Sequence, residues 1–289
     1  MGWGSGVRRT TRRVVSLLAS ASLVAGLLAV STGTAAAAPG GLKSLTCSGG
    51  NLTTLTPELI KSGTYRTITV TGFCEIESGA TVVVTSGLTV ALGGFLVASG
   101  ALDNPGPGGF TPDCNRAITV SGGIQVGKAG SLFLGDGPGT GCFPSTQTTV
   151  NGGLTAVDPK FLIVHGVTIN GGIASHGGSG PLGGPICFPE PGVGLICPFW
   201  TALEDNRING GVTVDGYDGF WFGFIRNEVN GPVNLTNNKL VDPDGNEYVT
   251  NTVHGRLNCS GNSPTPWVGD SGGAPNVVTG PMTGQCVGL

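Results

Sequence analysis

The sequence predicts an all-β protein, a parallel β-helix (β-solenoid) of roughly nine short coils with disulfide-stapled loop insertions. The first observation is a short pattern that returns about every 20 to 25 residues. The second is composition, because the chain has 54 glycines and is rich in valine, isoleucine and threonine. Units this short cannot hold a pair of helices, so each unit is predicted to be one coil stacked on the next.

The repeated pattern is a β-branched residue, a polar residue, glycine, one further residue and an aliphatic residue. Its full copies are Val120–Ile124, Val150–Leu154, Ile169–Ile173, Ile208–Val212, Val229–Val233, Val253–Leu257 and Val278–Met282. We expect the glycine to form a corner in a backbone conformation that disfavours a Cβ atom. The asparagines before it are expected to stack as an interior amide ladder of Asn151, Asn170, Asn209 and Asn230.

The residues after each glycine alternate between apolar and polar, as in a strand with one buried face. The first predicted inward column is Ile124, Leu154, Ile173, Val212, Val233 and Leu257. The second, two residues on, is Val126, Ala156, Ser175, Val214, Leu235 and Cys259. Between them lie the mostly polar, outward residues Gln125, Thr155, Ala174, Thr213, Asn234 and Asn258.

Residues 1–37 are predicted to be a signal peptide, which leaves 38–289 as a single β-solenoid domain that is secreted, extracellular or associated with the cell surface. Four arginines precede an apolar run, Val14–Val30, and small residues follow it up to Ala37. These are the three parts of a secretory signal. An uncleaved anchor helix is the alternative, and the export route, general secretory or twin-arginine, stays open.

The charge of the expected mature chain argues against nucleic acid as a partner. Removing four arginines leaves 14 − 4 = 10 basic residues against 17 acidic ones, a net charge of −7. Nucleic acids and anionic membranes both require basic patches. No second long apolar segment follows, so no membrane association is expected after cleavage of the signal.

The 8 cysteines all lie beyond the signal, and an even number in an exported chain predicts disulfides. Metal binding is less well supported, because no Cys-x-x-Cys spacing occurs. Among the many pairings possible, we favour neighbours along the chain. The predicted bonds are Cys47–Cys74, Cys114–Cys142, Cys187–Cys197 and Cys259–Cys286.

Two segments near the C-terminus, Asn251–Pro264 and Pro275–Cys286, resemble a group of exported actinobacterial β-helix-like proteins of uncharacterised function. The repeats more broadly resemble a right-handed parallel β-helix. The insertions around Cys114, Cys142 and 187–197 depart from a plain stack. The resemblance to the actinobacterial group implies no known activity.

Proteins with the parallel β-helix fold that this chain resembles include polysaccharide lyases and hydrolases. The chemistry of these enzymes needs paired carboxylates or a calcium cluster with a basic residue. The best local supply of charged groups is Glu204, Asp205, Arg207, Asp215, Asp218, Arg226 and Glu228. Arg207 and Glu228 hold equivalent repeat positions, which predicts a surface ion pair. The segment 242–247 resembles a calcium loop but is better explained as a turn. We predict no catalytic residue, metal or cofactor.

An aromatic run, 217–224, is the most unusual local feature. Trp221 is out of phase with its neighbouring phenylalanines, so an exposed indole would offer sugars a flat apolar face. The predicted ligand-binding residues are Trp221, Asp215, Asp218 and Arg226. Packing beneath a loop at 176–199 is the alternative.

The sequence therefore indicates an exported structural or interaction module at the cell exterior, with a cell-surface or extracellular glycan as its expected partner. The alternative is a carbohydrate-active enzyme, a polysaccharide lyase or hydrolase, on a β-helix. A self-associating surface polymer is a further alternative, and the oligomeric state is left open.

Overall fold

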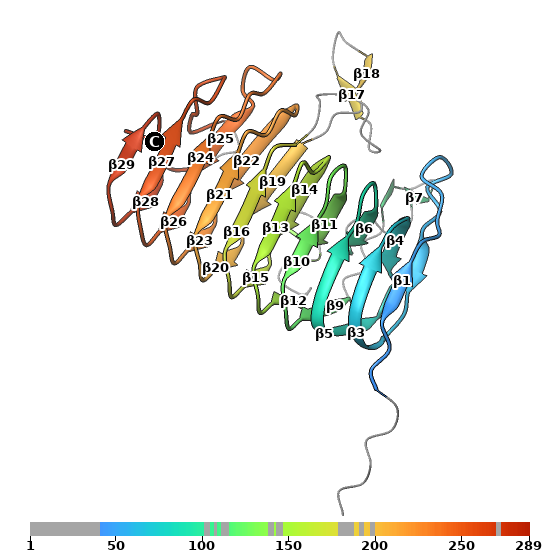
Figure 1. Ribbon diagram of the computed structural model, residues 1–289. Helices are drawn as coiled ribbons and strands as arrows, with labels where there is room; N and C mark the ends of the chain where they lie inside the picture. The colour runs from blue at the N-terminus through green and yellow to red at the C-terminus, as the bar shows by residue number, and fades with distance from the viewer. Residues whose placement is uncertain are drawn as a thin grey trace, which may run out of the picture. The chain divides into compact units, whose positions relative to one another are not determined.

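The computed structural model describes residues 41–100, 105–106, 109–110, 116–137, 142, 147–178, 188–190, 194–196, 200–269 and 273–289. Within these residues the chain winds as a parallel β-helix, as predicted, and successive coils pair in parallel (Figure 1). No helix long and apolar enough to span a membrane occurs among them. The predicted signal peptide lies outside the described residues.

The larger sheet has 17 strands and supplies two runs of most coils. Its strands are β1 (Leu45–Cys47), β3 (Gly63–Val70), β5 (Thr81–Val90), β9 (Ala117–Val120), β10 (Ile124–Val126), β12 (Gln147–Val150), β13 (Leu154–Val157), β15 (Thr168–Ile169), β16 (Ile173–His176), β20 (Arg207–Ile208), β21 (Val212–Asp215), β23 (Glu228–Val229), β24 (Val233–Thr236), β26 (Thr252–Val253), β27 (Leu257–Ser260), β28 (Val277–Val278) and β29 (Met282–Gly284).

The smaller sheet has 8 strands and supplies the third run. These are β2 (Glu58–Ile60), β4 (Phe73–Ile76), β6 (Phe95–Ala98), β11 (Ser131–Gly135), β14 (Phe161–His165), β19 (Trp200–Glu204), β22 (Trp221–Ile225) and β25 (Asn246–Val249). Two antiparallel hairpins also occur, β7 (Pro105–Gly106) with β8 (Gly109–Phe110), and β17 (Phe188–Glu190) with β18 (Gly194–Ile196).

The predicted register is confirmed through the central coils. Val212 pairs with Ile173 on one side and Val233 on the other, and all three are buried. Thr213, the next residue, pairs with Ala174 and Asn234 and is partly exposed. One face of these strands therefore lines the core while the other faces outward.

The corner glycines serve a different purpose from the one expected. Gly152 and Gly171 do not adopt left-handed backbone angles. A Cβ on either residue would instead lie 2.6 Å from backbone atoms of the adjacent coil. Glycine is needed here because the coils approach closely. Left-handed residues occur at the other two corners, for example Gly216 (φ 75°) and Asp205 (φ 57°).

The predicted amide ladder exists, but it is exposed rather than interior. Asn170 Nδ2 donates to Asn151 Oδ1 at 2.8 Å, and the same bond continues to Asn209 and Asn230. The reason is that this corner turns its side chains outward while its backbone groups bond directly between coils. Interior corner groups are satisfied by other side chains.

Two buried asparagine ladders satisfy the backbone groups of the interior corners, which was the role expected of the exposed ladder. In the first, the backbone N–H of Asn206 donates to Asn227 Oδ1 at 3.1 Å, and the N–H of Asn227 donates to Asn251 Oδ1 at 2.9 Å. In the second ladder, Asn238 Oδ1 accepts a hydrogen bond from the backbone N–H of Tyr217 in the preceding coil. Asn262 Oδ1 accepts in the same way from the N–H of Asn238. Each side chain replaces a hydrogen bond that the turning backbone cannot make.

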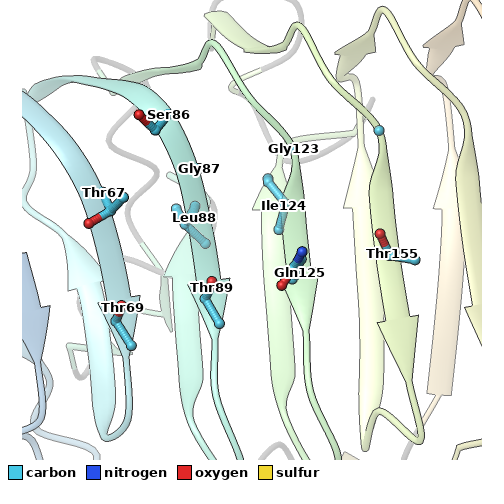
Figure 2. A pocket seen from close by; sticks show the side chains of 11 residues that line it. Thr67, Thr69, Ser86, Gly87, Leu88, Thr89, Gly123, Ile124, Gln125 and Thr155 are labelled. Carbon is cyan, nitrogen blue, oxygen red and sulfur yellow. The ribbon is translucent and has the colours of Figure 1, made fainter.

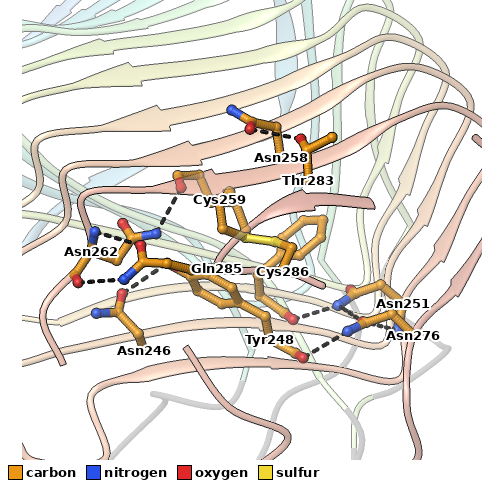
Figure 3. Close-up of a disulfide and its surroundings, with 12 residues drawn as sticks. Asn246, Tyr248, Asn251, Asn258, Cys259, Asn262, Asn276, Thr283, Gln285 and Cys286 are labelled. Carbon is orange, nitrogen blue, oxygen red and sulfur yellow. Dashed lines mark hydrogen bonds between the residues drawn. A yellow bond between two sulfur atoms is a disulfide. The ribbon is translucent and has the colours of Figure 1, made fainter. Parts of the chain in front are cut away.

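Disulfides join coils at both ends of the β-helix. Cys47–Cys74 links the first two coils with a Cα–Cα distance of 6.3 Å. Cys259–Cys286 links the last two at 5.1 Å, beside the second buried ladder (Figure 3). Both predicted bonds are confirmed, and they are typical of a protein in an oxidising extracellular environment.

The other two predicted disulfides cannot be assigned in the same way. Cys142 is disulfide-bonded. Its predicted partner, Cys114, lies outside the described residues, as do both cysteines of the predicted Cys187–Cys197 bond. These pairings therefore stay predictions.

Candidate functional site

A shallow hollow of about 460 Å³ lies on the outer face of the 17-stranded sheet, where β3, β5, β10 and β13 run side by side. Figure 2 shows side chains of these neighbouring strands around it. Its polar lining is Thr67, Thr69, Ser86, Thr89, Gln125 and Thr155. None of the described residues that line it is charged, so the surface offers hydroxyl, amide and backbone groups.

The floor of the hollow is glycine because adjacent coils almost touch there. Gly87, Gly123 and Gly153 line it. A Cβ atom on Gly123 would lie 2.8 Å from the carbonyl oxygen of Gly153, and one on Gly153 would lie 2.9 Å from that of Gly172. A larger residue would force the coils apart, so the sequence keeps the floor free of side chains.

Several backbone N–H groups along this floor have no hydrogen-bond partner in the described part of the chain. The N–H of Ile124 donates to the carbonyl oxygen of Gly153 at 2.9 Å, and Leu154 donates in the same way to Gly172. By contrast, the N–H groups of Gly123, Gly153 and Gly172 donate to no group in the described part of the chain. These glycines are partly exposed, so their N–H groups are available to solvent or to a ligand.

The hollow belongs to a longer row of small side chains, which we call the polar column. Its members pair in register as Thr46, Thr69, Thr89, Gln125, Thr155, Ala174, Thr213, Asn234, Asn258 and Thr283. Not one of these residues is charged. Nine strand spacings of about 4.8 Å give the row a length of about 43 Å.

The exposed asparagine ladder runs in the same direction along the adjacent corner. Asn151 directly precedes Gly152 and Gly153, whose backbone leads into the hollow. Asn170 and Asn209 each donate one N–H to one neighbour and accept one from the other, whereas Asn151 only accepts and Asn230 only donates along the ladder. An amide carries two donors and two acceptor lone pairs, so hydrogen-bonding capacity remains at every coil.

A second candidate lies on the 8-stranded sheet, where β14, β19 and β22 end. We call it the acid–base cluster, and it consists of His165, Glu204, Asp205 and Arg226. Arg226 donates to Asp205 through Nε at 2.7 Å and through Nη2 at 2.8 Å, and to Glu204 Oε2 at 3.0 Å. His165 Nε2 lies 3.8 Å from Glu204 Oε1, too far for a hydrogen bond.

Burial decides the protonation of this cluster. It raises the pKa of Glu204 to about 7, against the opposing effect of Arg226 and with a contribution from Asp205. Burial also lowers the pKa of His165 to about 4. His165 Nε2 is enclosed and finds no hydrogen-bond partner among the described residues. At neutral pH the cluster therefore holds a neutral imidazole beside a carboxyl group able to donate a proton.

The backbone of the cluster is also unusual. Asp205 and Arg226 adopt left-handed angles, with φ of 57° and 54°. The same corner of the preceding coil uses Gly166, at φ 64°. Left-handed backbone is costly for residues with a Cβ, so the paired charges occupy positions where glycine or asparagine would be less strained.

The four predicted ligand-binding residues do not form one group. Arg226 lies at the far end of β22 from Trp221, about 17 Å away for five extended residues. Arg226 is engaged by Asp205 and Glu204. Asp215 ends a strand of the other sheet, where hydrogen bonds from Thr236 and then Asn237 lower its pKa. Asp218 is exposed on the turn between the two sheets.

Trp221 points away from the core, as its phase predicts, yet it is only partly exposed. Phe222 and Phe224 are buried inside the coil. Trp221 instead pairs with Trp200 on β19 and packs against a second apolar cluster on the outer face of the 8-stranded sheet. That cluster continues through stacked or edge-on rings as Trp200, Phe161, Phe133, Phe95 and Phe73.

Three smaller predictions have clear outcomes. Arg207 and Glu228 form the predicted surface ion pair, at 3.5 Å. The segment 242–247 begins with a turn, in which the N–H of Asp244 donates to Asp242. The one described group with metal-ligand spacing combines Glu58 with two cysteines of a disulfide, which leaves no thiolate to bind a metal.

The sequence analysis did not predict the hollow, and it included Glu204, Asp205 and Arg226 among the charged groups of one region without predicting that His165 joins them. The glycines of the floor were read as corner residues, although the recurring Gly-x-Thr of Gly87 and Gly153 marks a bare position beside a hydroxyl. Within the cluster, His165 and Glu204 pair in register across coils of very different length. The available signal was Gly166, which occupies the same corner position in its coil as Asp205 does in the next.

No protein-family model, curated protein or solved structure matches this chain.

Proposed function

We propose that this protein is an exported binding module whose ligand is a glycan outside the cytoplasm, and that the ligand docks on the outer face of the 17-stranded sheet. The observation that carries the proposal is the hollow, because hydroxyl and amide side chains surround Gly123 and Gly153, whose N–H groups donate to no group in the described part of the chain. Sugars present many hydroxyl groups, and each can donate to or accept from such a surface.

The rigidity of the face supports the same role. Thr89 and Gln125 belong to strands hydrogen-bonded on both sides, above a core column that is fully buried. The backbone of such strands is already ordered before a ligand binds, so docking on this face requires no rearrangement of a loop and avoids that entropic cost. The predicted signal peptide and the two disulfides are consistent with a protein that functions outside the cytoplasm.

A glycan array tests the proposal. We expect the mature chain to bind a subset of the array, and Gln125→Arg, which places a long charged side chain in the hollow, to abolish that binding. Thr252→Arg is the matched control, because Thr252 lies on an outward position of the same sheet but outside the hollow. Retained binding in the Gln125 variant would place the ligand elsewhere.

The acid–base cluster favours one second function, a carbohydrate-active enzyme. Glu204 holds a proton near neutral pH and is only partly enclosed, and a protonated carboxyl is what glycoside cleavage requires of its general acid. The test is release of reducing ends or unsaturated sugars from the polysaccharides that bind. Release that stops in Glu204→Gln would establish the enzyme, whereas an absence of release would leave binding alone.

A further inference from the structure

We infer that the ligand is an uncharged, linear polysaccharide that lies along the β-helix axis, crossing the strands, with its affinity growing with chain length. This inference rests on the proposed function, and it adds the class of ligand and its direction. It follows from the charge of the face and from the repetition of its groups.

The charge of this face restricts the class of ligand. The residues of the polar column are all uncharged, and so are the described residues lining the hollow; the exposed cation Arg256 donates to Asn234 of the column at 3.4 Å, beyond the hollow. A charged ligand would lose hydration on this surface without gaining an ion pair, which is unfavourable. The expected mature chain is also net negative, which opposes acidic polymers in particular. A neutral glycan avoids both the uncompensated loss of hydration and the repulsion by the negative net charge.

The arrangement of the hydrogen-bonding groups favours one direction for the ligand. Hydrogen-bonding groups repeat from coil to coil in three parallel rows that overlap in part. The polar column is interrupted only at Ala174, the glycine N–H row includes Gly123, Gly153 and Gly172 and ends before Pro232, and the exposed asparagine ladder runs from Asn151 to Asn230. All three rows run across the strands at one strand spacing, about 4.8 Å. Along a single strand the pattern ends after two or three residues. Only a ligand aligned with the rows meets the same groups repeatedly.

The length of the polar column exceeds that of the hollow. A sugar ring is comparable in size to one strand spacing, so each added sugar reaches roughly one further coil. The hollow crosses four strands, while the polar column continues beyond it through Ala174 to Thr213 and onward. A short oligomer fills the hollow alone, and a longer one also contacts the column. Because equivalent sites are linked, the gain from each is multiplied.

The experiment compares size series of neutral and acidic oligosaccharides by titration calorimetry. The neutral probes are cello-oligosaccharides and N-acetylated chito-oligosaccharides, each from disaccharide to octasaccharide, and the acidic probes are oligogalacturonates. We expect the affinity for at least one neutral series to rise at each step past the tetrasaccharide, by several-fold overall, and the acidic series to bind at least tenfold more weakly.

Three variants locate the ligand. Gln125→Arg, in the hollow, should abolish binding of every length. Thr213→Arg, two strands beyond the hollow, should remove the additional affinity of the long oligomers and leave the short ones unchanged. Thr252→Arg, outside the column, is the control and should change neither.

The outcomes separate this inference from the proposed function. If neither neutral nor acidic series binds, the proposed function itself fails. If short and long oligomers bind equally, or Thr213→Arg has no effect on long ones, the axial direction is overturned while docking in the hollow stands. Equal or stronger binding of oligogalacturonates overturns the assignment of a neutral ligand.

Discussion

The acid–base cluster makes a prediction about stability that can be worked out from its two titrating groups. The pKa of Glu204 is raised from 4.5 to about 7, so folding favours its protonated form. The resulting stability is complete below pH 4.5 and is lost as the pH rises to about 7. At 1.36 kcal/mol for each pH unit, the loss is about 3 kcal/mol.

His165 has the opposite dependence. Its pKa is lowered from 6.5 to about 4, so folding favours the neutral imidazole. The associated stability is complete above pH 6.5 and is lost as the pH falls to about 4, again by about 3 kcal/mol. As the pH changes across this range, the stability lost through one group is nearly equal to the stability regained through the other. The pair therefore adds little pH dependence to the stability of the wild-type protein. Each single variant should expose the dependence of the remaining group.

Urea denaturation followed by far-ultraviolet circular dichroism, at several pH values between 4 and 8, measures this directly. Relative to wild type, Glu204→Gln should gain about 3 kcal/mol of unfolding free energy as the pH rises through 4.5 to 7. His165→Gln should gain a similar amount as the pH falls through 6.5 to 4. A difference from wild type that stays constant across this range, for either variant, would refute the reasoning.

Three further predictions concern the fold and use thermal and urea denaturation. Val212→Asp should cost several kcal/mol because the carboxylate enters the core, whereas Thr213→Asp should cost less than about 1 kcal/mol; equal melting temperatures would show the register to be wrong. Asn227→Ala should cost about 2 to 3 kcal/mol by stranding buried backbone groups, and Asn170→Ala much less, with the reverse order contradicting the two ladder assignments. Reducing the C-terminal disulfide, which closes a loop of 27 residues, should cost about 3 kcal/mol, and an unchanged urea midpoint would speak against its stabilising role.

Much of the fold was predictable because one motif encodes both the corner and the register. The aliphatic residue after each glycine pair, such as Val212, must face the core, and the next residue, such as Thr213, must then face outward. The inward orientation of one residue and the outward orientation of the next therefore predict the strand register of every central coil. The disulfides Cys47–Cys74 and Cys259–Cys286 were predicted from the spacing of neighbouring cysteines, and each joins residues about one coil apart in sequence, which lie side by side in space.

The candidate sites were less predictable for physical reasons. A glycine required by a positive φ and a glycine required by a close backbone approach look the same in a sequence, so Gly123 and Gly153 were interpreted as corner residues and not as the floor of a hollow. The acid–base cluster depends on the third run of each coil, which carries no recurring motif. Arg226 is near Trp221 in sequence, yet an intervening strand places the two at opposite ends.

The most direct test of the account is a crystal structure of the mature protein with the neutral oligosaccharide that binds best. The account predicts that the sugar chain lies over Gly123 and Gly153, between the polar column and the exposed asparagine ladder, with its long axis crossing the strands. A sugar chain bound beside Trp221, or one running parallel to a strand, would contradict it.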